Sequence, residues 1–182
     1  MPGDVAVHFG PYVLDARIAV GGTSEVYLAH PADPRATPRR LVVKRLLPDF
    51  LADDEGRTMF EREARLHAAI HHENVVEVFG SGVTDGGEPY LAMEYVEGTD
   101  GYRLLRRLRG DRRTLPARVA VHIAAAILDA LASAHAAKDE RGRPLGIVHR
   151  DVTPSNVYLA SNGAVKLIRQ QIRAYRGDGA EP

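Results

Sequence analysis

Alternating apolar and polar positions dominate the first half of the chain. Short runs of branched and aromatic residues, separated by Gly, Pro and Asp, predict strands over 12–19, 25–29, 41–47, 75–83 and 89–96. Aspartates at 49, 53 and 54 precede a stretch with helical periodicity, which predicts one helix over 53–70. This half of the chain is therefore predicted to form a mostly antiparallel sheet with a single helix.

The second half changes to helical patterning and then returns to strands. An arginine-rich segment, 102–109, is predicted to be helical, and Pro116 suits the first turn of a long helix that reaches about Lys138. Two short apolar runs flank Ser161-Asn162-Gly163, a favourable hairpin turn. The expected fold class is α+β, and residues 169–182 show no clear period.

Composition narrows the class of function. The chain has 182 residues, and its 24 basic residues balance 24 acidic ones, which argues against a nucleic-acid binder that works through bulk charge. There is no cysteine and no signal-peptide pattern, so we expect a cytoplasmic protein. The longest apolar run, 119–132, is short and is interrupted by His122 and Asp129, so no membrane segment is expected.

The arginines between 103 and 113 allow two interpretations. They could form a phosphate-binding patch, or they could be the solvated face of a helix and the loop after it. The zero net charge of the chain favours the solvated face.

Two charged residues stand at positions that periodicity assigns to a core. Glu63 shares a helical face with Met59 and Leu66, and alternation places Lys44 on the same side of a strand as its apolar neighbours. A buried charge without a partner costs several kcal/mol, so the simplest solution is that Lys44 and Glu63 meet. The alternative is that each side chain extends separately to an edge of the core.

The segment His149-Arg150-Asp151-Val152-Thr153-Pro154-Ser155-Asn156 carries the strongest chemical signal. An Asp and an Asn five residues apart in a Pro-containing loop can place a hydroxyl-orienting carboxylate near a metal-binding amide oxygen, an arrangement suited to phosphoryl transfer. With the strand lysine, the helix glutamate and the Met93-Glu94-Tyr95-Val96 segment, residues 12–168 resemble a eukaryotic-type serine/threonine protein kinase domain of the bacterial kind.

The resemblance implies a role for each matching residue. Lys44 would contact the α/β-phosphates of ATP and pair with Glu63, Asp151 would be the catalytic base, and Asn156 would bind Mg²⁺. The remaining nucleotide contacts that the resemblance implies are the phosphate loop at Gly21 and Gly22, the adenine roof at Val26 and Val42, the gatekeeper Met93, the hinge at Glu94 and Val96, the ribose position Asp100 and the pocket floor Tyr158. The implied domains are an extension over 1–11, the N-lobe and hinge over 12–96, part of the C-lobe over 97–168 and a non-family tail over 169–182.

The departures from the family pattern bear on activity. The glycine loop keeps only its second glycine, Thr153 replaces a lysine, and Arg169-Gln170-Gln171 stands where the family has Asp-Phe-Gly. An arginine in place of a metal-binding aspartate would repel Mg²⁺, and no activation segment follows before Pro182. We therefore expect little or no phosphoryl transfer from MgATP to protein Ser/Thr hydroxyls.

Two other interpretations stay open from the sequence. The chain could be a non-catalytic module that binds a nucleotide or a partner chain, or the product of an interrupted reading frame. In the family, the long helix over 116–138 packs against a later helix, so we also expect it to expose an apolar face near Ile123, Ile127 and Leu131 that promotes association.

Overall fold

The computed structural model describes residues 7–168 and 173–174. The chain divides into two compact units. The first comprises Met1–Ala68 and Glu77–Tyr95, and the second comprises Ala69–Val76 and Val96–Pro182.

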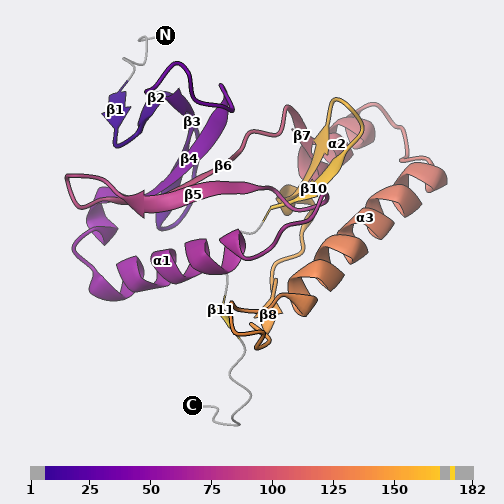
Figure 1. Cartoon of the computed structure of the whole chain (residues 1–182). Coiled ribbons are helices and arrows are strands. Elements are labelled where there is room, and N and C mark those ends of the chain that lie inside the picture. Colours follow the sequence, from indigo (N-terminus) through magenta and orange to yellow (C-terminus); the bar gives the residue numbers. More distant parts are fainter. Residues whose placement is uncertain (1–6, 169–172, 175–182) are drawn as a thin grey trace. The chain divides into compact units, whose positions relative to one another are not determined.

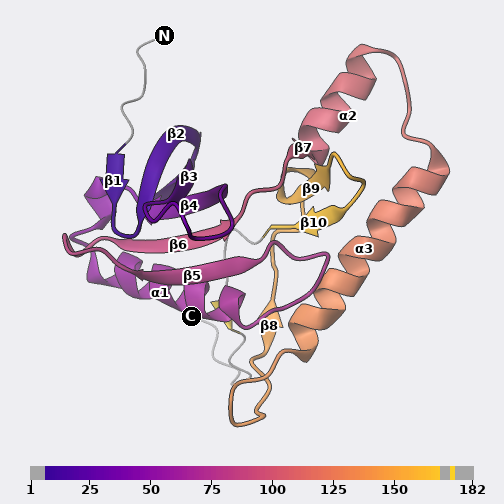
Figure 2. The ribbon, with the colours of Figure 1, turned by 45° about the horizontal axis from the view of Figure 1, so that its top comes forward.

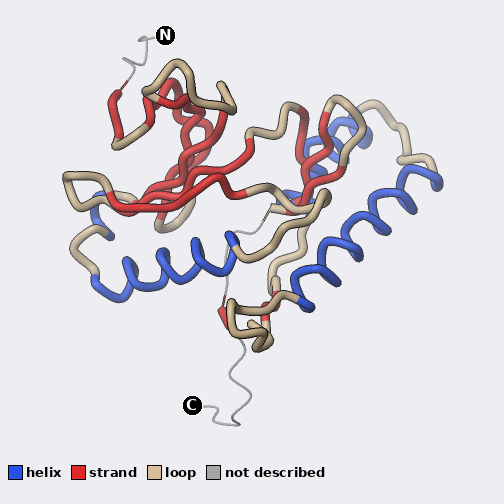
Figure 3. The backbone as a smooth tube through the Cα atoms, in the orientation of Figure 1, coloured by secondary structure: helices blue, strands red, loops and turns tan. Residues whose placement is uncertain are grey.

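The first unit is built on a six-stranded antiparallel sheet with strand order β1-β2-β3-β4-β6-β5. Its elements are β1 (Val7–Phe9), β2 (Tyr12–Val20), β3 (Ser24–Pro31), β4 (Leu41–Leu46), the short 3-10 helix η1 (Pro48–Phe50), α1 (Asp54–Ala68), β5 (Val78–Val83) and β6 (Pro89–Glu94). Helix α1 packs against β5 and β6, as Figures 1 and 3 show. The predicted strands and the predicted helix all form, and the predicted α+β class is confirmed.

The buried side chains on the two faces of β4 differ in character. Leu41 and Val43 belong to an apolar cluster on one face, together with Phe9, Leu14, Ala29 and Ala92. Val42, Lys44 and Leu46 alternate with them on the other face, and all three are buried. Alternation along this strand therefore presents a lysine to the side of the sheet opposite the apolar cluster.

Strand β1 is not predicted by the sequence pattern, which assigns residues 1–11 to an extension. Val7 pairs with Leu14 of β2, and Phe9 is only 4% exposed within the apolar cluster. The guanidinium of Arg45 lies 5.1 Å from the Phe9 ring centroid and 5.0 Å from that of Tyr27. These contacts join the beginning of the chain to the sheet.

Glu25 of β3 is a buried glutamate that is hydrogen-bonded to two arginines. Glu25 accepts hydrogen bonds from Arg45 Nε at 2.9 Å and from Arg17 Nη1 at 3.3 Å. Burial by itself would raise the pKa of Glu25, but the hydrogen bonds from these arginines outweigh burial and lower that pKa. Glu25 is thus held as a carboxylate between Arg17 and Arg45.

The second unit combines two helices with small sheets. Its elements are β7 (Gly98–Asp100), α2 (Gly101–Gly110), α3 (Ala117–Ala136), β8 (Ile147–Val148), the 3-10 helix η2 (Pro154–Asn156), β9 (Val157–Ala160), β10 (Val165–Leu167) and β11 (Arg173–Ala174). The strands form one sheet in the order β10-β9-β7 and a second, β11-β8. Helix α3 contacts β8 and β10, and α2 contacts β7, β9 and η2 (Figure 2).

A segment from the middle of the chain completes the second unit. Asn74 Nδ2 donates to the Val165 carbonyl at 2.9 Å, and Val75 forms a parallel bridge with Leu167. The strand predicted over 75–83 therefore begins only at Val78. Residues 69–76 bond to β10, nearly a hundred positions later, which no local pattern indicates.

Helix α3 is long and apolar enough to cross a membrane by length and composition alone, with 17% of the relevant window buried. Within this helix only the alanines at 126, 130 and 134 are buried. Ile123, Ile127 and Leu131, the predicted centre of the exposed face, are half-buried. The exposed apolar face lies instead on the side that carries Val121 and Leu128.

Candidate active site

The first unit contains the ion pair that periodicity predicted. Lys44 Nζ on β4 donates to Glu63 Oε1 on α1 at 2.7 Å, and each side chain is 11% exposed. The Lys44 ammonium also lies 5.7 Å from the Phe60 ring centroid. Phe60 precedes Glu63 by three residues on α1, so helical spacing could have identified this third contact. Glu63 and Leu66 of the predicted helical stripe are buried, whereas Met59 is 45% exposed.

The residues assigned to the adenine roof surround Lys44 on the same face of the sheet. Val26 stands opposite Lys44 across β3 and β4, and Val42 stands opposite Met93 across β4 and β6. Opposed residues in an antiparallel pair share a face, so all four project to one side. Val42 and Met93 are buried, and Val26 is half-buried.

The glycine loop between β2 and β3 is open. Gly21 N donates to the Ser24 carbonyl at 2.7 Å, which closes the loop as a tight turn. A Cβ added at Gly22 would meet no atom within 4 Å, and one added at Gly21 would meet the Ser24 carbonyl at 3.4 Å. Neither glycine is required by a left-handed backbone, and the space beside Gly22 is open.

The two predicted hinge residues fall on different units. Glu94 ends β6 in the first unit, and its N–H donates to the Glu77 carbonyl at 2.8 Å. Glu94 Oε2 in turn accepts from Glu77 N at 3.2 Å. Val96 is half-buried and begins the main segment of the second unit.

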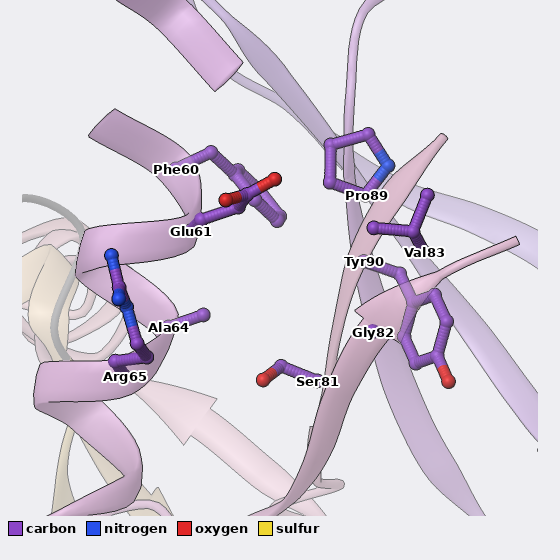
Figure 4. A pocket seen from close by; sticks show the side chains of 9 residues that line it. All are labelled: Phe60, Glu61, Ala64, Arg65, Ser81, Gly82, Val83, Pro89 and Tyr90. Carbon is purple, nitrogen blue, oxygen red and sulfur yellow. The ribbon is translucent and has the colours of Figure 1, made fainter. Parts of the chain in front are cut away.

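A cavity of about 260 Å³ lies between α1 and the edge of the sheet, and sequence reasoning did not predict it. Figure 4 shows Phe60 and Ala64 of α1 on one side of the cavity and Ser81 and Pro89 on the other, with the ring of Tyr90 turned away from the helix. Because Phe60 lines the cavity and also lies beside the Lys44 ammonium, the cavity and the ion pair share one side chain.

In the second unit, Asp151 and Asn156 are joined directly. Asn156 Nδ2 donates to the Asp151 carbonyl and to Asp151 Oδ2, both at 2.8 Å. The amide group is thereby oriented, with its NH₂ toward Asp151 and its oxygen directed elsewhere. This bond holds the two residues of the predicted motif in a fixed relation.

His149 holds the same loop to the end of β10. Its Nε2 lies 2.9 Å from the Ile168 carbonyl, and its Nδ1 lies 3.3 Å from Asp151 N. A carbonyl only accepts and a backbone N–H only donates, so these neighbours assign the ring proton to Nε2. Arg150 between them has φ of +64°, a left-handed conformation unusual for a residue other than glycine. His149 therefore has a structural position in this loop.

Asp100 and Tyr158 are neighbours in register across β7 and β9. Asp100 Oδ1 accepts from Arg103 N at 2.8 Å, so the carboxylate caps the N-terminus of α2. Burial, followed by the nearby Asp100 charge, raises the pKa of Tyr158. The position matched to the ribose contact thus also holds the start of a helix.

One oxygen in this loop fits a magnesium ion. Asn156 Oδ1 is fully buried, and among the described residues it has no hydrogen-bond partner. A buried amide oxygen without a donor is suited to a hard cation, which takes oxygen ligands. Within residues 7–168 and 173–174, no group of three His, Asp or Glu side chains is arranged to hold a metal. Arg169, at the position of the family's second ligand, lies outside the described residues.

Comparison with known proteins identifies the family to which this chain is similar. The protein kinase domain family matches residues 12–169. The tyrosine-protein kinase MasK of Myxococcus xanthus is 37% identical over 160 residues, which cover 88% of this chain and 25% of MasK. The serine/threonine-protein kinase PknL of Mycobacterium tuberculosis is 36% identical over 156 residues, which cover 86% of this chain and 35% of PknL.

Solved structures give the same result. The crystal structure of the PknI kinase domain of Mycobacterium tuberculosis superposes with a TM-score of 0.67 at 32% identity, covering 93% of this chain and 62% of that one. The chain thus spans about a quarter to a third of the curated relatives named here, and less than two thirds of that solved kinase domain.

Proposed function

This chain belongs to the protein kinase domain family, and on that premise we propose that it binds ATP and carries the residues for transferring the γ-phosphate to a protein hydroxyl. The observation that carries the proposal is the buried Lys44–Glu63 pair at 2.7 Å. Only three of the 24 basic residues are lysines, and this one is retained on a buried face of the sheet.

Lys44 is the residue that we assign to the α/β-phosphates of ATP. Glu63 fixes the ammonium, so the lysine loses little side-chain entropy when a phosphate binds. Val26, Val42 and Met93 project to the same side of the sheet as Lys44 and supply the apolar surface that we assign to the adenine ring.

Asp151 is the residue that we assign to the acceptor hydroxyl. Asn156 engages Asp151 Oδ2, and the other carboxylate oxygen would receive the proton. The hydroxyl oxygen forms a bond to the γ-phosphorus, the bond from that phosphorus to the bridging oxygen of ADP breaks, and the hydroxyl proton passes to Asp151. Positioning of the hydroxyl is thus the main contribution of this loop.

Asn156 Oδ1 would hold Mg²⁺, which supplies charge neutralisation for the phosphate oxygens when it is bound. With Arg169 at the family's aspartate position, this chain offers one fewer anionic ligand and an added positive charge. We therefore propose that ATP binding depends only weakly on Mg²⁺ and that transfer is slow.

The acceptor class that we propose is protein Ser/Thr. PknL is named a serine/threonine-protein kinase and SCO3848 of Streptomyces coelicolor a probable one, whereas MasK is named a tyrosine-protein kinase. Assays with both a Ser/Thr and a Tyr peptide distinguish the two classes.

Thermal unfolding with ATP, with and without Mg²⁺, tests the binding step. ATP at one hundred times its dissociation constant should stabilise the folded chain by about 2.7 kcal/mol, which raises the unfolding midpoint by roughly 5–10 °C. Lys44→Met should abolish the shift. If ATP at saturating concentration produces no shift, the proposal that this chain binds a nucleotide is wrong.

Incubation with γ-labelled ATP tests the transfer step separately. Slow labelling that disappears in Asp151→Asn and increases in Arg169→Asp supports the proposal. A thermal shift without any labelling, even in Arg169→Asp, would instead indicate a non-catalytic nucleotide-binding module.

A further inference from the structure

The Lys44 ammonium is held by Glu63 through a single hydrogen bond. Of the three N–H donors of Lys44, one is directed at Glu63 Oε1, at 2.7 Å. The neighbours of Lys44 across the sheet are apolar, with Val26 opposite on β3 and Leu91 opposite on β6. One hydrogen bond fixes the distance between the two charges, but not the path that the flexible four-carbon stem of the lysine takes to reach Glu63.

Phe60 supplies a second contact to this ammonium from the same turn of α1. The ammonium lies over the Phe60 ring, 5.7 Å from its centroid, which is within the range of about 6 Å for attraction between a cation and the negative face of an aromatic ring. Phe60 is 6% exposed and precedes Glu63 by three positions, so the ring and the carboxylate project from one face of the helix. Helix α1 therefore holds the ammonium by two groups at once.

Packing alone does not account for a phenylalanine at this position. A ring that only filled the core would be surrounded by protein atoms, yet Phe60 borders the cavity of about 260 Å³ that Figure 4 shows. Atoms beside a void lose dispersion contacts on that side, so the ring is held less firmly by packing than a fully enclosed one. The attraction to Lys44 is a separate reason for the ring to keep its place.

We propose that Phe60 is a positioning residue for Lys44, and that together with Glu63 it directs the ammonium toward a phosphate of the nucleotide. The inference rests on the proposed function, because it assigns the remaining donors of Lys44 to ATP. The ring face attracts the cation but offers no lone pair, so it holds the ammonium and leaves N–H donors for the phosphate oxygens. The ring is also apolar, so it keeps water from the Lys44–Glu63 pair and strengthens the attraction between the two charges.

Phe60→Leu removes the aromatic face and keeps an apolar side chain, so it tests the ring and not the burial. Calorimetric titration of the full chain with ATP should give a dissociation constant about tenfold higher in Phe60→Leu than in the unchanged chain. Phe60→Tyr keeps the aromatic face, and the cavity has room for its hydroxyl, so its affinity should stay within about twofold of the unchanged chain. Far-UV circular dichroism checks that both variants are folded.

Fluorination separates the charge of the ring from its shape. Phenylalanines that carry one, two or three fluorine atoms, incorporated at position 60, lose electron density from the ring face stepwise with little change in volume. The dissociation constant for ATP should therefore rise at each step. The matched control is the same series at Phe79 of β5, which is 38% exposed and has no cation over its ring among the described residues. A Phe60 ring that only packs would give the same affinity throughout the series.

Nuclear magnetic resonance detects the contact between Lys44 and Phe60 without any nucleotide. The chain has only three lysines, Lys44, Lys138 and Lys166, so the signals of their terminal methylene groups can be assigned by substitution. Protons above an aromatic ring are shielded by its circulating electrons. The Lys44 methylene signal should therefore move downfield in Phe60→Leu, while the signals of the other two lysines stay in place.

Two results would overturn the proposal. The first is a Lys44 methylene signal that Phe60→Leu leaves unchanged. The second is ATP binding that neither Phe60→Leu nor the fluorine series weakens, which would leave the proposed function standing without Phe60. An unchanged chain that binds no ATP would instead overturn the proposed function, and the Lys44 signal would then separately support or refute the hold of Phe60 on the ammonium.

Discussion

Lys44 and Glu63 come from a strand and a helix nineteen positions apart in sequence, and their charged atoms lie 2.7 Å from each other with little exposure to solvent. Each charge is the principal compensation for burying the other. The pair is therefore sensitive to the loss of one partner, and much less sensitive to the replacement of both.

Glu63→Ala should lower the free energy of unfolding by about 3–5 kcal/mol, because it leaves the Lys44 ammonium buried without its carboxylate. The double variant Lys44→Met with Glu63→Leu should recover most of that loss. Urea unfolding measures both. As a control, Arg143→Ala breaks a solvent-exposed pair with Asp139 and should have a much smaller effect. Equal losses in the single and double variants would contradict the prediction.

Stability should fall in acid partly because of Glu25. Its pKa is lowered in the folded state, so it stabilises the fold above the ordinary pKa of a glutamate. That contribution is lost as pH decreases through the lowered folded-state pKa. Glu25→Gln should therefore reduce the difference in unfolding free energy between pH 7 and about pH 3. An unchanged pH dependence in this variant would show that Glu25 is not linked to folding.

Asn156→Ala should weaken any effect of Mg²⁺ on ATP binding, because it removes the buried Oδ1 that we assign to the metal. It also removes two hydrogen bonds to Asp151, which should cost about 1–3 kcal/mol of stability. Calorimetric titration of ATP with and without Mg²⁺ measures the first effect, and chemical unfolding measures the second. If the metal dependence survives in the folded variant, the assignment of Asn156 is wrong.

The Lys44–Glu63 contact was predictable because two independent periodicities each placed a charge on a buried face. Strand β1 was not, because three residues before Gly10-Pro11 are too few for a pattern, and burial of Phe9 depends on Tyr90, far along the chain. The place of residues 69–76 in the second unit was not predictable either, because it depends on contacts with Val165 and Leu167, far along the chain.

The exposed face of α3 was predicted to exist but was misplaced. Apolar residues cover most of this helix, so periodicity cannot tell which of them turn inward. The structure shows that Ala126, Ala130 and Ala134 do, and small side chains permit a helix to lie close to strands. The capping role of Asp100 could have been predicted, because an Asp directly before a helical stretch is a recognisable N-cap. The family resemblance instead suggested only a ribose contact for this residue.

Gly98 of β7 should tolerate no side chain. A Cβ at this position would overlap the Leu159 carbonyl of β9, which belongs to the rigid backbone. Gly98→Ala should therefore destabilise the second unit by about 1–3 kcal/mol or more. Gly80→Ala is the control, because a Cβ there meets nothing within 4 Å. Chemical unfolding of both variants makes the comparison, and equal stabilities would contradict the expected overlap.

Because Asp100 caps α2 and is also the residue assigned to the ribose, nucleotide binding and the stability of the first turn of α2 are coupled. Oδ1 of this carboxylate holds Arg103 N, and Oδ2 lies 3.2 Å from Arg103 Nε. A ribose that drew Asp100 away would release the first amides of α2, whereas a ribose that shared it would leave them protected. Deuterium uptake at residues 101–104 would thus report how a nucleotide engages Asp100 at the start of α2.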